Sequence, residues 1–139
     1  MVNKFIDPST PLKELIKMQR KLYKTFVPLR CYILNKEVVF TFAGFEHLHS
    51  DGRKRRRGEK DARSRLLLLD HAPAVITQAR MMKKDTKLET ESYSGKREYY
   101  YELYSKVGPK QIPVVLTLRQ VGNGALHFYG IRYKGKKTT

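Results

Sequence analysis

The sequence predicts an α+β fold in which N-terminal helices pack on a four-stranded antiparallel sheet, with an additional N-terminal helix and hairpin. Two observations predict it. The first half of the chain carries apolar residues at helical spacing, and the second half alternates apolar and polar residues between glycine-containing turns. The 139 residues suffice for one domain with its own core. We expect a single domain over residues 1–133 and a disordered basic tail over residues 134–139.

The first predicted element is a helix that begins near Pro11 and ends before Pro28. Ser9 and Thr10 offer hydroxyl oxygens for an N-cap, and a proline suits the first turn of a helix. The residue before a proline avoids the helical conformation, so Pro28 ends the pattern. The apolar residues at helical spacing, which we expect to pack in the core, are Leu12, Leu15, Ile16, Leu22, Tyr23 and Phe26.

A β-hairpin is predicted next, over residues 30–42. Its strands are residues 31–34 and 38–40, and the turn lies at Asn35 and Lys36. Cys31, the one cysteine of the chain, lies in this apolar run and is expected to be a buried thiol. A short helix that carries Phe45, His47 and Leu48 is expected after Gly44, which ends the second strand.

A strongly basic segment follows, in which eight of the residues 53–65 are Lys or Arg. Glycines mark its first half as a loop. Residues 59–69 are expected to form a helix, because Glu59 and Asp61 in the first turn suit the helix dipole. A further helix is predicted from about Pro73 to residue 82, since a proline is tolerated in a first turn.

The remaining chain alternates apolar and polar residues in four segments. These predicted strands are residues 86–93, 97–107, 112–120 and 125–133. The turns between them contain glycine, and they are too short for crossover connections. We therefore expect an antiparallel meander against which the helices pack.

The turn between the last two strands fixes which of their side chains face each other. A two-residue turn would mix the apolar and polar faces, because strand side chains alternate between faces. A three-residue loop at residues 122–124 pairs Leu118 with Phe128, and Arg119 with His127. The residues of the resulting polar face are Thr117, Arg119, His127 and Tyr129.

An arginine directly opposite a histidine is a costly arrangement, because the cation lowers the pKa of the imidazole. Such arrangements gather at functional sites. A half-exposed polar face, on which His127 merely occupies a strand position, is the other interpretation of the same pattern.

The net charge of the chain is +16, from 29 Lys and Arg against 13 Asp and Glu. A field of this sign concentrates polyanions, of which nucleic acid is the commonest, although a basic solvated surface gives the same composition. The N-terminus has no apolar segment typical of a signal peptide, and no run approaches the ~18 apolar residues of a membrane span. We expect a cytoplasmic protein, or one delivered into a target cell's cytoplasm, and no membrane partner.

Two histidines and several cations point to RNA cleavage without a metal ion. One imidazole takes the proton of a 2′-hydroxyl and the other protonates the leaving 5′-oxygen, which leaves a 2′,3′-cyclic phosphate. Arginines hold the phosphate and the negative charge of the transition state. The acidic residues are scattered without metal-ligand spacing, so we expect neither a metal nor a cofactor. The residues expected to bind the nucleic acid are Arg53, Lys54, Arg55, Arg56, Arg57, Lys60 and Tyr129.

Several short motifs resemble one ribonuclease group. They are Gly44-Phe45-Glu46-His47-Leu48, the basic segment, Arg65 before a leucine-rich run, Leu118-Arg119-Gln120-Val121-Gly122-Asn123-Gly124, and His127-Phe128. Together they resemble the phage- and toxin-associated members of the barnase–EndoU–colicin–RelE superfamily. The resemblance implies helices packed on a four-stranded antiparallel sheet, and metal-independent cleavage of RNA, often of tRNA. It also implies a catalytic site made of His47, Arg65, Arg119 and His127.

The resulting hypothesis is a hydrolase of the toxin or phage-effector type. His127 and His47 form the acid–base pair, Arg119 and Arg65 stabilise the phosphate, and an acidic immunity or antitoxin protein is the expected partner. Two alternative functions account for the same positive net charge without catalysis. One is a basic RNA- or DNA-binding module, and the other is a structural or interaction protein of a phage particle.

Overall fold

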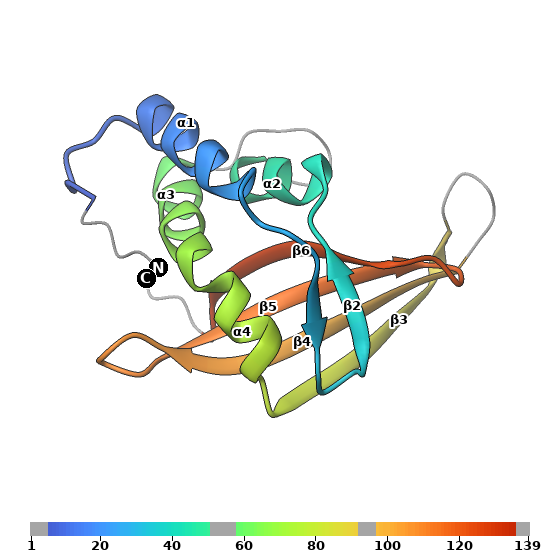
Figure 1. Cartoon of the computed structure of the whole chain (residues 1–139). Coiled ribbons are helices and arrows are strands. Elements are labelled where there is room, and N and C mark those ends of the chain that lie inside the picture. Colours follow the sequence, from blue (N-terminus) through green and yellow to red (C-terminus); the bar gives the residue numbers. More distant parts are fainter. Residues whose placement is uncertain (1–5, 51–57, 92–96, 136–139) are drawn as a thin grey trace.

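The computed structural model describes residues 6–50, 58–91 and 97–135, and for residues 85–91 it describes the backbone alone. The fold is α+β, as the sequence predicts (Figure 1). The helices are α1 (Leu12–Tyr23), α2 (Phe42–His49), α3 (Glu59–Leu68), the 3-10 turn η1 (Leu69–His71) and α4 (Ala72–Gln78). The strands are β1 (Leu29–Cys31), β2 (Lys36–Val39), β3 (Met81–Glu91), β4 (Arg97–Val107), β5 (Ile112–Val121) and β6 (Leu126–Tyr133).

The sheet has six strands in the order β1-β2-β6-β5-β4-β3. Strands β3 to β6 form the expected antiparallel meander. The prediction of a four-stranded antiparallel sheet is nevertheless wrong, because the β1–β2 hairpin joins the same sheet. Val38 and Val39 of β2 pair with Leu126 and His127 of β6 in parallel, which makes the sheet mixed.

Several predicted boundaries shift for local reasons. Pro11 is the N-cap residue of α1, and the Ser9 hydroxyl instead donates a hydrogen bond of 2.9 Å to Asp7. Both hairpin strands begin two residues earlier than predicted, because the turn covers residues 32–35 instead of Asn35 and Lys36. The Asn35 N–H donates a 3.1 Å hydrogen bond to the Tyr32 carbonyl, and Asn35 has a positive φ of 56°. Ala79 is extended at the C-cap of α4, so β3 begins at Met81 rather than at residue 86.

The core lies between the helices and one face of the sheet (Figure 1). Each α-helix contributes a fully buried aliphatic side chain, namely Leu15, Leu48, Leu66 and Ile76. The fully buried side chains on the sheet include Leu103, Val114, Leu116, Leu118, Leu126, Phe128 and Ile131. Cys31 is also buried, as predicted, and burial raises the pKa of its thiol.

Helix α2 approaches strand β6 so closely that one position between them must be glycine. A Cβ at Gly44 would collide with the carbonyl oxygen of Phe128, and it would lie 2.9 Å from the hydroxyl oxygen of Tyr23. That hydroxyl donates a 2.6 Å hydrogen bond to the Thr41 carbonyl, so Tyr23 cannot retreat without losing the bond. Glycine therefore sets the distance between α2 and β6.

Replacing Gly44 by alanine tests this contact. In a helix interior the change normally stabilises a protein by about 0.5–1 kcal/mol. Here we expect a loss of about 1–3 kcal/mol in the free energy of unfolding, because an overpacked contact must displace backbone. Chemical denaturation measures the difference. Gly58→Ala is the control, since a Cβ at that N-cap glycine meets no atom within 4 Å among the described residues. A Gly44→Ala variant as stable as the parent protein would contradict the account.

Candidate functional site

The predicted register of the last hairpin is confirmed. Leu118 pairs with Phe128 and Arg119 pairs with His127 across β5 and β6. Gly122 adopts a positive φ of 57° in the turn. Beyond this point the pairing shifts by one residue, because Thr117 pairs with Gly130 and leaves Tyr129 as a bulge.

Arg119 is held on the polar face of the sheet by a buried carboxylate. Its Nη2 donates a 2.9 Å hydrogen bond to Oε2 of Glu98, which is 5 % exposed. The Tyr100 hydroxyl donates a 2.7 Å bond to the other carboxylate oxygen. Burial pulls the pKa of Arg119 down, but the hydrogen bond to Glu98 and the nearby Tyr100 and Glu98 outweigh it and raise that pKa. The guanidinium is therefore charged and fixed in direction.

Tyr129 connects Arg119 to helix α2. The guanidinium carbon of Arg119 lies 5.6 Å from the centre of the Tyr129 ring, and the Tyr100 ring meets that ring edge-on at 5.7 Å. Tyr129 also stacks on His47, with ring centres 4.2 Å apart. The Nδ1 atom of His47 would lie 3.6 Å from a Cβ at Gly130, so this imidazole lies directly over the backbone of β6.

His127 completes the group from the next position on the same face of β6. It precedes Tyr129 by two residues, or ~7 Å along a strand. Burial first, and then the charge of Arg119, lower the pKa of His127 below 6.5. The imidazole is consequently neutral at pH 7. Because the folded-state pKa lies below the unfolded value, the stability that neutral His127 contributes is lost as the pH falls through that folded-state pKa.

We call this group the polar cluster, and it consists of His47, Glu98, Tyr100, Arg119, His127 and Tyr129. Two of its members, Glu98 and Tyr100, are missing from the residues predicted from the sequence as a site. A local signal for them exists, because a glutamate is followed two residues later by a tyrosine twice in β4. Glu102 likewise accepts a 2.7 Å bond from Tyr104 and a 3.2 Å bond from Arg132.

The other predicted site residues lie on helix α3 or outside the described residues. Arg65 donates a 2.8 Å hydrogen bond from Nε to Asp61 one turn earlier, and Lys60 is exposed on the same helix. The described contacts therefore join His47, Arg119, His127 and Tyr129, and they place Arg65 with Asp61. The basic residues 53–57 lie outside the described part of the chain.

Within residues 6–50, 58–84 and 97–135, no three His, Cys, Asp or Glu side chains come together in a way that could hold a metal ion. In the part of the chain that the structure describes, no helix has the length and apolar character needed to span a membrane.

Comparisons with known proteins add no assignment. No family model, no curated protein and no solved structure matches this chain.

The influence of Arg119 on His127 can be measured directly. In an Arg119→Gln variant we expect the pKa of His127 to rise, because the adjacent positive charge is gone. We expect it to stay below 6.5, because burial is the larger cause of the shift. An NMR titration of the imidazole protons gives both values. Arg132→Gln is the matched control, since that arginine pairs with Glu102 and lies five residues further along β6. An unchanged His127 pKa in the Arg119 variant would overturn this electrostatic link.

Proposed function

We propose that the protein is a metal-independent endoribonuclease whose site is the polar cluster. The observation that carries the proposal is that His47 and Arg119 both contact Tyr129, while His127 pairs with Arg119 on the neighbouring strand. Two imidazoles and a fixed guanidinium are the groups that this cleavage needs. The proposal includes three further parts: a relationship to the barnase–EndoU–colicin–RelE superfamily, tRNA as a substrate and an acidic protein as a partner.

His127 has the protonation state of a general base, because its lowered pKa leaves it neutral at pH 7. In the proposed reaction it takes the proton from the 2′-hydroxyl, and the 2′-oxygen attacks the adjacent phosphorus. His47 in its protonated form gives a proton to the 5′-oxygen, which leaves as the P–O bond breaks. The products are a 2′,3′-cyclic phosphate and a free 5′-hydroxyl.

Arg119 stabilises the charge on the phosphate in this scheme, and Glu98 acts as a positioning residue that aims the guanidinium. The Nε atom of Arg119 is buried and has no hydrogen-bond partner among the described residues. Arg65 is the second proposed phosphate contact, and to reach it a phosphate must compete with Asp61. The basic residues 53–57 would add contacts to the RNA backbone that depend on salt but not on sequence.

A second candidate function is nucleic-acid binding without cleavage. It is favoured by the two carboxylates that occupy the proposed phosphate contacts, Glu98 on Arg119 and Asp61 on Arg65. A protein of this kind needs the net charge of +16 but no productive pair of imidazoles.

The catalytic proposal predicts the behaviour of histidine variants. Incubation of total tRNA and rRNA with the protein should yield cyclic phosphate ends, and EDTA should not inhibit. We expect His127→Ala and His47→Ala each to slow cleavage by about 100-fold or more, the usual contribution of a general acid or base. Mass spectrometry of the RNA ends measures the products. His71→Ala is the control, because His71 lies in η1 and has no role in the scheme.

The outcomes separate the two candidates. Full cleavage by the His47→Ala/His127→Ala double variant would rule out the proposed roles. Salt-dependent binding of RNA by the parent protein, with no cyclic phosphate ends at any time, would instead establish the second candidate.

A further inference from the structure

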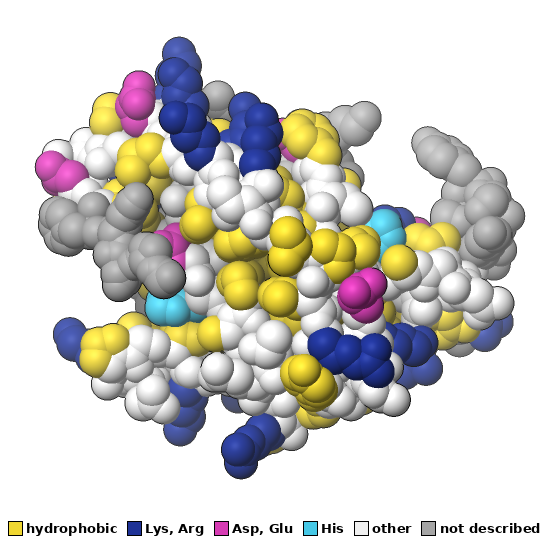
Figure 2. All heavy atoms as spheres, in the orientation of Figure 1, with side chains coloured by type: hydrophobic (Ala, Val, Ile, Leu, Met, Phe, Trp, Pro, Cys, Tyr) yellow, Lys and Arg dark blue, Asp and Glu magenta, His cyan; other side chains and the backbone are white. Residues whose placement is uncertain are grey.

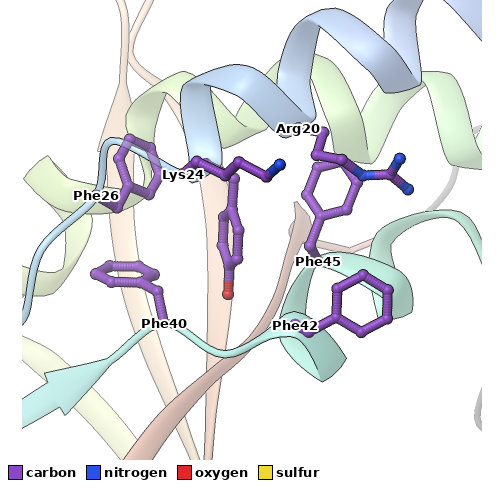
Figure 3. A pocket seen from close by; sticks show the side chains of 7 residues that line it. Arg20, Lys24, Phe26, Phe40, Phe42 and Phe45 are labelled. Atoms are coloured by element: carbon purple, nitrogen blue, oxygen red, sulfur yellow. The ribbon is translucent and has the colours of Figure 1, made fainter.

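A pocket of about 550 Å³ opens where α1, the end of β2 and the start of α2 meet (Figure 3). It is separate from the polar cluster. Its lining residues are Arg20, Tyr23, Lys24, Phe26, Phe40, Phe42 and Phe45. The volume lies within the range of about 300–1,000 Å³ that is typical of pockets for small molecules and single chemical groups.

The inner wall of the pocket consists of aromatic rings. The Tyr23 ring has its centre 5.8 Å from Phe26, 5.8 Å from Phe40 and 5.3 Å from Phe45. Phe42, the first residue of α2, is 68 % exposed at the mouth of the pocket. Figure 2 shows the hydrophobic area over this region, with cationic side chains along α1 above it. The pocket thus offers an apolar aromatic surface to a ligand, and the Phe42 ring is its most exposed part.

Two cations border the rings. The guanidinium carbon of Arg20 lies 5.6 Å from the centre of the Phe45 ring, and Lys24 is exposed one helical turn further on. Glu46 reaches Arg20 only at 3.9 Å. The Nε atom of Arg20 is buried, and the described residues offer it no hydrogen-bond partner. A buried donor of this kind is costly unless an acceptor reaches it.

We propose that this pocket holds one nucleotide of a single-stranded nucleic acid, with its base against Phe42 and its phosphate toward Arg20 and Lys24. The inference rests on the proposed function and names the substrate class as single-stranded. A nucleotide has a flat π surface and an anion, which are the two features that the pocket complements. Proteins that bind single strands hold the backbone in a basic groove and stack the bases on aromatic side chains. Bases inside a duplex are stacked and cannot reach such a ring.

The position of the pocket on α2 connects it to the polar cluster. Phe42 and His47 are five residues apart, so they point to different sides of the helix. The eight residues of α2 extend over only ~12 Å. A strand whose base occupies the pocket can therefore cross α2 and present a phosphate a few nucleotides away to His47 and Arg119. An acidic amphipathic protein segment also combines apolar and anionic groups. Unlike a nucleic-acid strand, however, it does not carry a flat ring on every unit of the chain that could stack on the exposed Phe42.

The test measures binding separately from cleavage. A fluorescent single-stranded oligodeoxynucleotide has no 2′-hydroxyl and survives the proposed reaction, and a duplex of equal length is the comparison ligand. By anisotropy at fixed salt, Phe42→Ala should weaken single-strand binding about tenfold, the usual effect of losing one stacking ring, and leave duplex binding unchanged. Tyr32→Ala is the matched control, because Tyr32 is also 68 % exposed but lies in the β1–β2 turn. It should change neither affinity.

Three results would overturn the pocket proposal. One is single-strand binding by Phe42→Ala equal to that of the parent protein, and another is an equal loss for the duplex. The third is Phe42-dependent binding of a helical Leu/Glu peptide in place of the oligonucleotide, which would make the pocket a protein-docking site. Phe42-dependent binding of the single strand together with no cleavage of RNA would support the pocket and overturn the nuclease function alone.

Discussion

The close approach of α2 to β6 at Gly44 is the constraint on which both candidate surfaces depend. Because Gly44 has no side chain, the helix backbone rests against the carbonyl of Phe128. On the core side this places Phe45 against Tyr23 and leaves Phe42 at the mouth of the aromatic pocket. On the other side it lays His47 on Tyr129. A helix one methyl group further from the strand would loosen both contacts.

Electrostatics inside the sheet then determine what the polar cluster can do. In a chain of net charge +16, the carboxylate of Glu98 is nearly buried and serves to orient one guanidinium and one phenol. The same environment raises the pKa of Tyr100 to about 12, through burial first and then the hydrogen bond to Glu98. The phenol therefore keeps its proton at neutral pH, whereas burial and the charge of Arg119 lower the pKa of His127. The cluster thus combines a cation paired with a buried carboxylate, an imidazole whose pKa is lowered and a neutral phenol.

Local patterns were sufficient to predict the hairpin of β5 and β6. Apolar and polar residues alternate along both strands, and with the glycine-rich turn only one register keeps them on separate faces of the sheet. This register places Arg119 opposite His127. The helical elements around Phe45 and after Gly58 were predictable for the same reason, because their signals lie within a few residues.

Contacts between distant segments could not be predicted in this way. The parallel pairing of β2 with β6 has no local signal, so the sequence pattern does not predict the six-stranded sheet. Glu98 reaches Arg119 only because Tyr100 pairs with Arg119 across β4 and β5, which depends on the loop between these strands. The stacking of His47 on Tyr129 depends on a bulge and on the angle of a helix. The alternation of Glu and Tyr along β4 was nonetheless visible in the sequence.

The central claim is that one nucleic-acid strand contacts both sides of α2. Photo-crosslinking tests it most directly, with a single-stranded RNA that carries 4-thiouridine and 2′-O-methyl groups to prevent cleavage. Mass spectrometry then identifies the attached peptides. The account predicts cross-links to the segment that contains Phe42 and to the segment of β6 that contains Tyr129. Cross-links confined to β1, β3 or α4, or none at a salt concentration at which the RNA is bound, would contradict it.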